Sequence, residues 1–215
     1  MVNSDNFISR VLSSIVIFFL FAFTVYSGGI SFYLLIFSIS VLSSFEWYNL
    51  TKGNKVLYIF ALLLIALPNA SLIYLYSLSY GKHILIWLIL TIWGIDVTAY
   101  LFGKNFGGAK ICSVISPSKT WHGLFGAILA GILFTFCASL FFGIFSILYS
   151  PIIGFVIAIM AQLGDFTESA IKRIYKIKDS SNIIPGHGGI LDRMDGFIFT
   201  APIVVIYLND FYNYI

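Results

Sequence analysis

Long, uninterrupted apolar runs limit what this chain can fold into more than any other feature of its sequence. They lie at roughly residues 11–26, 30–45, 56–77, 84–102, 123–142, 145–163 and 196–209. A helix crosses the hydrocarbon core of a bilayer with about 20 apolar residues, in a range of about 17–25. Because a segment in lipid must satisfy its own backbone hydrogen bonds, the runs predict an all-α, polytopic integral membrane protein with about seven transmembrane helices. Pro68 is expected to kink the third helix.

Composition points to the same fold class. Hydrophobic residues make up 60% of the 215 residues and charged residues only 10%, whereas a soluble domain carries about 25% charged residues. A chain this apolar cannot cover itself with a polar surface, which excludes a soluble globular protein. No internal repeat or separable soluble segment is visible. We therefore expect one membrane domain, with N-terminal transmembrane helices in residues 1–80 and a catalytic transmembrane region in residues 81–215.

The distribution of basic residues predicts which loops share a side of the membrane. With seven spans, the N-terminus and residues 46–55, 103–122 and 164–195 lie on one side. Of the twelve Lys and Arg residues, only Lys82 falls on the other side. Positive charge collects on the cytoplasmic side of a membrane protein. The two most polar loops are therefore predicted to face the cytoplasm together, where they can build one active site.

Asp96 is an acid with apolar sequence on both sides. Ionisable residues inside or at the edge of a membrane are energetically expensive and suggest a functional site. On a helix, Asp96 shares a stripe with Ala99, Tyr100 and Gly103, which favours close packing and an inward-facing carboxylate. A hydrogen-bonded aspartate that only packs helices together is the alternative. We favour a part in a polar site.

The segment "QLGDFTESAIKRIYK" places five polar residues within roughly 100° on one helix face. They are Asp165, Glu168, Ser169, Lys172 and Lys176. A solvated face held by ion pairs at i,i+3 and i,i+4 is one interpretation. Against it, Asp165 directly follows an apolar run, so the stripe begins at the expected membrane boundary. Carboxylates followed by ammonium groups suit a divalent cation beside a polyphosphate.

The loop "IIPGHGGILDRMDGF" combines helix-breaking residues with two carboxylates. Pro185 and the glycines let backbone amides approach a ligand closely, as in an anion-binding nest. Asp192 and Asp195, at i,i+3, are expected to share a face as the last helix begins. Their hard oxygen atoms suit Mg²⁺, which takes one or two carboxylates together with substrate phosphates. His187 is interpreted as a hydrogen-bonding loop residue and not as a metal ligand.

The second polar loop, "GKNFGGAKICSVISPSKTWHG", is basic and rich in glycine. It contributes Lys104, Lys110, Ser116, Lys119 and Thr120 as candidate phosphate-binding residues. A basic loop that binds anionic lipid headgroups is an equally good interpretation of this segment alone. Taken with the carboxylates, however, the two loops supply what phosphoryl or nucleotidyl transfer needs. The residues by themselves predict an Mg²⁺-dependent transferase acting between a soluble phosphate compound and a membrane lipid.

Three segments also resemble a known family. The run "SAIKRIYKIKDSSNIIPGHGGILDRMD", from Ser169 to Asp195, looks like the signature of the phosphatidate cytidylyltransferases, or CDP-diacylglycerol synthases. "SPSKTWHG" is similar to an upstream element of that family, with Ser118 where Lys is usual and His122 where Glu is usual. "DVTAYLFGKNFG" resembles a third family segment. The resemblance covers residues 85–210.

The resemblance implies a specific reaction and site. CTP and phosphatidic acid would give CDP-diacylglycerol and pyrophosphate in phospholipid biosynthesis, with Mg²⁺ as the cofactor and K⁺ as a further ion beside it. The implied metal ligands are Asp165, Asp192, Asp195 and Asp96. The implied catalytic residues are Asp165, Asp192, Lys172 and Arg193. The implied phosphate-binding residues are Ser116, Lys119, Thr120, Ser169, Arg173, Lys178, His187, Gly188 and Gly189.

The same resemblance implies the inner (plasma) membrane of a bacterium as the location, with the active site facing the cytoplasm. It is compatible with a homodimer and gives no reason to expect nucleic acid. Three other functions stay open. A CTP-dependent polyprenol or phytol kinase would transfer the γ-phosphate of CTP to an alcohol, and a CDP-archaeol synthase would use an ether lipid. A cation or lipid transporter would carry its acids in the middle of its spans.

Overall fold

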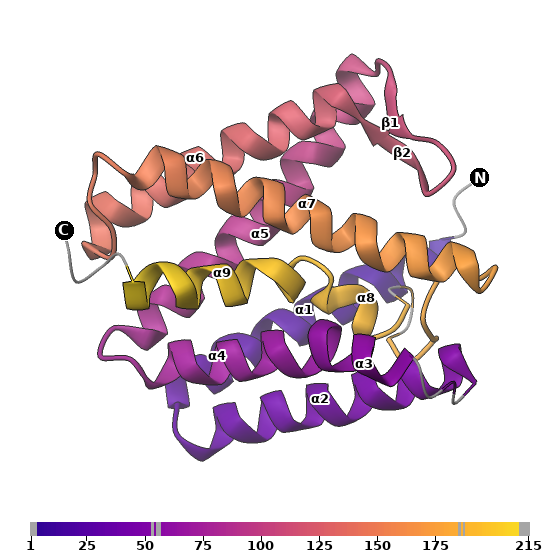
Figure 1. The fold of residues 1–215 in the computed structure, drawn as a ribbon, viewed down its shortest axis with the longest axis horizontal. Helices are drawn as coiled ribbons and strands as arrows, with labels where there is room; N and C mark the ends of the chain where they lie inside the picture. Colours follow the sequence, from indigo (N-terminus) through magenta and orange to yellow (C-terminus); the bar gives the residue numbers. More distant parts are fainter. Residues whose placement is uncertain (1–3, 53, 55–56, 185, 187, 211–215) are drawn as a thin grey trace.

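The computed structural model of the protein describes residues 4–52, 54, 57–184, 186 and 188–210, and it describes the side chains of the first helix in part. Helices dominate it (Figure 1). The elements in chain order are α1 (Ser4–Ser27), α2 (Ile30–Thr51), α3 (Tyr58–Ala61), the π-helix η2 (Leu62–Ala66), α4 (Leu67–Ser77), α5 (Gly81–Phe106), β1 (Lys110–Cys112), β2 (Ser116–Thr120), α6 (Trp121–Phe142), α7 (Ser150–Ile174), α8 (Leu191–Met194) and α9 (Phe197–Asp210).

The expected class, a multi-pass helical membrane protein, is confirmed. Among the described residues, five helices are long and apolar enough to cross a bilayer: Ile30–Thr51, Ile59–Ser77, Gly81–Phe106, Trp121–Phe142 and Ser150–Ile174. The last predicted span corresponds to α9, which the structure describes over 14 residues, Phe197–Asp210.

The predicted grouping of loops agrees with the arrangement of helix ends. In Figure 1, the C-terminal ends of α2, α5 and α7 and the β1–β2 hairpin lie at one end of the molecule, and α9 ends at the opposite end. The two strands of the hairpin pair antiparallel, with Lys110 opposite Thr120 and Cys112 opposite Ser116. Both polar loops identified in the sequence are therefore at the same end of the helix bundle.

Pro68 interrupts the third span, as expected. The five residues before Leu67 form a π-helical turn, in which the Leu67 N–H donates to the carbonyl of Leu62 instead of that of Leu63. A proline lacks an N–H donor and disturbs the preceding turn of a helix. The wider π turn accommodates that disturbance, and the chain then continues as α4.

Small residues bring α5, α6 and α7 close together. A Cβ atom added at Gly131 of α6 would collide with the backbone of Gly154 in α7, and the reverse is also true. At the other face of α6, a Cβ atom at Gly123 would meet the Ala99 carbonyl of α5. Close backbone approach at small residues is typical of helix packing in membranes. This packing holds α7, which carries the polar stripe, against α6, and α6 against α5.

The predicted stripe lies on α7, with one detail wrong. The helix continues past the apolar run and ends at Ile174, so Asp165, Glu168, Ser169 and Lys172 are on it as predicted. Lys176 has left the helix and adopts a left-handed backbone conformation, with φ of 56°. It therefore no longer shares the face of Asp165 and Glu168.

After α7 the chain folds back into the molecule. The loop leads to α8, and α9 begins in the interior of the molecule instead of at its edge (Figure 1). Leu191 of α8 and Ile198 of α9 are buried against Trp47, Leu64 and Ile65. Asp192 and Asp195 are consequently held among the helices, one on a short helix and the other just after it, and not on one face of a final span.

Candidate active site

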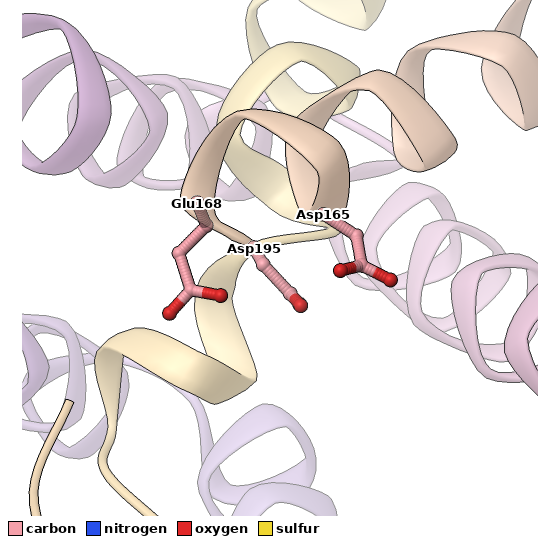
Figure 2. A group of neighbouring side chains, drawn as sticks. All are labelled: Asp165, Glu168 and Asp195. Carbon is pink, nitrogen blue, oxygen red and sulfur yellow. The ribbon is translucent and has the colours of Figure 1, made fainter. Parts of the chain in front are cut away.

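Three carboxylates converge beside α7. Asp165 and Glu168 project from the same face of that helix, and Asp195, between α8 and α9, points toward them (Figure 2). Each residue offers an oxygen atom within 4.8 Å of those of the other two. The spacing i,i+3 explains why the two α7 residues share a face. The fold-back of the chain after α7 explains how Asp195 reaches them.

Two lysines from different segments neutralise part of this charge. Lys119 of β2 places its Nζ 2.5 Å from Asp165 Oδ2 and donates a hydrogen bond to Gln162 Oε1 at 3.0 Å. Lys172 of α7 places its Nζ 2.6 Å from Glu168 Oε2 and 2.8 Å from Asp192 Oδ1. The β1–β2 hairpin and the segment that follows α7 thus both contact α7.

Asp192 contacts both Lys172 and the polar loop. Its carboxylate is buried and accepts hydrogen bonds from Lys172 Nζ, from the Ser180 N–H at 3.0 Å and from the Gly189 N–H at 2.8 Å. Burial alone would raise the pKa of Asp192, but hydrogen bonds, those from Lys172 and Gly189 among them, lower it to about 2. Asp192 therefore anchors the loop as a carboxylate, and Glu168 lies with Asp165 and Asp195 in the converging group.

Asp195 lies in the opposite electrostatic environment. Burial, followed by the negative charges of Asp165 and Asp96, raises its pKa. Its Oδ1 accepts a hydrogen bond from the Gly196 N–H at 2.7 Å. Carboxylates held this close to one another repel when ionised, so the group favours the arrival of positive charge.

Three of the residues predicted to bind phosphate make hydrogen bonds within the protein. Thr120 caps the N-terminus of α6, where its Oγ1 accepts from the Gly123 N–H at 3.1 Å. Ser169 Oγ donates to Asp165 Oδ1 at 3.1 Å and so orients that carboxylate. Arg173 Nε donates to the Ile115 carbonyl at 3.2 Å, which ties the hairpin to the end of α7.

The glycines of the loop allow close approach within the protein itself. Gly189 already donates its N–H to Asp192, and a Cβ atom there would collide with Ser180 Oγ and the Glu46 carboxylate. Gly188 has a φ of 82° and accepts a hydrogen bond from the Ile184 N–H. The predicted approach of backbone to a ligand is thus, at these two positions, an approach of backbone to buried carboxylates.

The remaining predicted residues differ in accessibility. Ser116 is buried within β2, whereas Lys178 and Arg193 are exposed. His187, together with Pro185, lies outside the described residues.

Sequence reasoning missed Glu46 of α2. It is buried, with 1% of its surface exposed, and its oxygens accept hydrogen bonds from the loop that follows α7. The available signal was a single acid in an otherwise apolar helix, a position where an ionisable residue is expensive.

A cavity of about 800 Å³ connects the acids with an apolar surface. Its polar lining includes Asp96, Lys104, Lys119, Asp165, Arg193 and Asp195. Its apolar lining includes Phe21 of α1 and Leu35, Ile39 and Leu42 of α2. Asp96 is exposed to this space instead of being enclosed between helices, which argues against a purely packing role.

The converging acids fit a divalent cation. Glu168 is 3% exposed, and its Oε2 forms an ion pair with Lys172 Nζ at 2.6 Å. A buried carboxylate is costly unless positive charge compensates it. Carboxylate oxygens are among the hard ligands that Mg²⁺ takes in proteins.

Comparison with known proteins points to one family. Residues 53–211 match the model of the cytidylyltransferase family. A phosphatidate cytidylyltransferase of Rickettsia bellii is 37% identical over 217 residues, which cover 98% of this chain and 94% of that protein. One of Rickettsia felis is 36% identical over 210 residues, covering 94% and 92%. One of Staphylococcus epidermidis is 39% identical over 151 residues, covering 69% and 58%.

Proposed function

This chain belongs to the cytidylyltransferase family, and we propose that it makes CDP-diacylglycerol and pyrophosphate from CTP and phosphatidic acid. One structural observation carries the proposal beyond the family likeness. Two carboxylates of the converging group, Asp165 and Asp195, line the same cavity as Lys119 and an extended apolar wall. A water-soluble triphosphate and a lipid phosphate can meet only at such a boundary.

Different parts of the cavity suit the lipid chains and the phosphates of the two substrates. The apolar side chains of α1 and α2 that line it suit the acyl chains of a lipid. Lys119 and Arg193 line the polar end, where their positive charge would attract both the phosphate of phosphatidic acid and the triphosphate of CTP. The reacting phosphates would therefore be held beside Asp165 and Asp195.

The reaction needs positioning more than proton transfer. A phosphate oxygen of phosphatidic acid attacks the α-phosphorus of CTP, and the bond between that phosphorus and the bridging oxygen to the β-phosphate breaks, so that pyrophosphate leaves. Phosphatidic acid is already anionic near neutral pH, so no residue has to act as a general base. Lys119 and Arg193 would offset negative charge on the phosphates. Lys172, fixed between Glu168 and Asp192, keeps the carboxylates in place.

Asp165, Glu168 and Asp195 are the residues that would hold Mg²⁺. Asp96 also lines the cavity, and its carboxylate would suit a K⁺ ion beside the Mg²⁺. Bound Mg²⁺ would neutralise charge on the transferring and leaving phosphates. Asp192 stays outside this set because its oxygens accept hydrogen bonds from Lys172 and from the loop amides.

We place the end of the molecule that carries the β1–β2 hairpin and the C-terminal end of α7 at the cytoplasmic face of a bacterial inner membrane. The chain would cross that membrane seven times, with α1 and α9 as the first and last crossings. The basic residues of the hairpin and of the α7 end lie at that end of the bundle, and Lys82 lies at the start of α5, at the other end (Figure 1). The excess of positive charge at one end supports this orientation.

A matrix of substrates tests the function. The purified protein in mixed micelles is supplied with Mg²⁺, with either CTP or ATP, and with either phosphatidic acid or an isoprenol, and the lipid products are identified by mass. We expect CDP-diacylglycerol from CTP and phosphatidic acid alone. A phosphorylated isoprenol would support the kinase alternative and contradict the proposal. Replacing phosphatidic acid by its archaeal ether counterpart tests the alternative of a CDP-archaeol synthase.

A further inference from the structure

Glu46 holds two ends of the glycine-rich loop at once. Its Oε1 accepts from Ser181 Oγ at 2.6 Å and from the Ile190 N–H at 2.9 Å. Its Oε2 accepts from Ser180 Oγ at 3.0 Å and from the Leu191 N–H at 2.8 Å. Each oxygen thus binds one hydroxyl from the start of the loop and one amide from its end. A buried carboxylate that binds four donors at these distances is fully satisfied.

Asp192 binds the same two ends from the other side. Ser180 donates its hydroxyl to Glu46 and its N–H to Asp192, and Gly189 donates its N–H to Asp192. Gly189 has no room for a Cβ atom because Ser180 and Glu46 lie against it. The loop is therefore closed between two carboxylates, of which one comes from α2, more than a hundred residues earlier in the chain.

This closure determines where the acids of the site lie. Glu46 binds the amides of Ile190 and Leu191, which directly precede Asp192. Asp192 in turn contacts Lys172, and Lys172 contacts Glu168. Three residues further along the chain, Asp195 completes the carboxylate group. A loosened loop would displace Asp192 and Asp195 together.

We propose that Glu46 is a positioning residue for cytidylyl transfer, which acts by closing the loop of residues 180–191 so that Lys172 and Asp195 face Glu168 and Asp165. This inference rests on the proposed function, and it assigns a role to a residue outside the region 53–211 that matches the family. It also makes α2 part of the catalytic unit and not only a wall of the cavity.

Glu46→Gln tests the proposal with little change in shape. The amide nitrogen of Gln is a donor, so two of the four loop donors would face another donor in a buried place. Loss of a residue that orients ligating groups typically lowers metal affinity or activity about 10–100-fold. We expect kcat/KM for CTP to fall within that range and the Mg²⁺ concentration for half-maximal activity to rise. The KM for phosphatidic acid should stay unchanged, since the apolar cavity wall is intact.

Two further variants make the test specific. Ser181→Ala removes one of the four donors and should shift the same parameters in the same direction by less. Ser44→Ala is the matched control, because its exposed hydroxyl bonds only the Ser40 carbonyl of its own helix. It should behave as the wild type.

Hydrogen exchange supplies a measurement that does not depend on turnover. In Glu46→Gln, amides of residues 180–191 should exchange faster, whereas peptides from α6 should keep the wild-type rate, and Mg²⁺ should raise the melting temperature less than in the wild type. If the wild type made no CDP-diacylglycerol, the proposed function would fail, and these two measurements would still decide whether Glu46 positions the loop.

Two results would overturn the inference. One is hydrogen exchange of residues 180–191 in Glu46→Gln at the wild-type rate. The other is a loss of activity that a smaller fraction of folded protein explains completely. If Glu46→Gln does not fold in detergent, Ser181→Ala decides the question, and wild-type values of KM for CTP and of the Mg²⁺ requirement in that variant would overturn it.

Discussion

At the scale of single residues, the acids near α7 and α8 divide into two kinds. Glu46 and Asp192 are surrounded by donors and hold the polar loop in place. Asp165, Glu168 and Asp195 lie close to one another, so their negative charges repel when they are ionised. The first kind stabilises the fold, and the second kind stores electrostatic repulsion that a cation would relieve. Substitutions should therefore separate stability from activity.

Asp195→Asn should abolish turnover without lowering stability. The substitution removes a carboxylate from the proposed cation site, and loss of one such preorganised group costs about 10²–10³ in turnover. It also removes repulsion between Asp195 and its neighbours Asp165 and Asp96. The melting temperature measured without Mg²⁺ should equal or exceed that of the wild type. Thr167→Val, at a half-buried position of α7 whose hydroxyl bonds the Leu163 carbonyl of its own helix, should leave both properties unchanged.

Asp192→Asn should lower both stability and turnover. Asn keeps only one acceptor oxygen, so Lys172 and the amides of Ser180 and Gly189 compete for it, and a lost buried hydrogen bond costs about 1–3 kcal/mol. Thermal unfolding in detergent should show a lower melting temperature than that of Asp195→Asn. Equal melting temperatures for Asp192→Asn and the wild type would contradict the anchoring role.

At the scale of elements, the β1–β2 hairpin and α7 form the two walls of the polar site. Lys119 joins them through Asp165 and Gln162, and its Nζ also lies 4.5 Å from the centre of the Phe166 ring. Arg173 ties the base of the hairpin to the end of α7. The hairpin is thus fixed relative to the acids by ionic and hydrogen-bonded contacts.

Lys119→Met should raise the KM for CTP and lower kcat/KM by about tenfold or more. The substitution removes both the ion pair with the partly buried Asp165 and the proposed contact with a phosphate. Steady-state kinetics in mixed micelles would measure this change. Val114→Ser, at the exposed tip of the same hairpin, is the control and should keep wild-type kinetics. A wild-type KM for CTP in Lys119→Met would remove this residue from the nucleotide site.

The helices of this protein could be predicted from sequence, and the closure of its loop could not. Apolar runs locate the spans because lipid imposes length and composition on each helix separately. The polar stripe on α7 also followed from local spacing, up to the residue where the helix ends. In contrast, Glu46 and Ser181 meet only through the tertiary fold. The same holds for the contacts of Asp192 with the loop and the approach of Asp195 to Glu168, which depend on a fold-back after α7 that leaves no periodic pattern.

At the scale of the whole molecule, the proposed function places the basic end of the helix bundle in the cytoplasm. Accessibility of single cysteines can test that orientation in a background with Cys112 and Cys137 replaced by Ser. In sealed right-side-out vesicles, a membrane-impermeant maleimide should label Lys82→Cys and not Lys178→Cys. Inverted vesicles should give the reverse pattern. Labelling of both positions from one side would contradict the proposed topology.

The central claim is that cytidylyl transfer to phosphatidic acid takes place at the carboxylate group. The most direct test follows radioactive phosphorus from CTP, labelled at either the α- or the γ-position, into lipid. It uses purified wild type and Asp195→Asn side by side, with Mg²⁺ and phosphatidic acid. We predict that α-label enters the lipid fraction with the wild type, that γ-label is released as pyrophosphate, and that Asp195→Asn transfers neither. Label from the γ-position in lipid, or full transfer of α-label by Asp195→Asn, would contradict the claim.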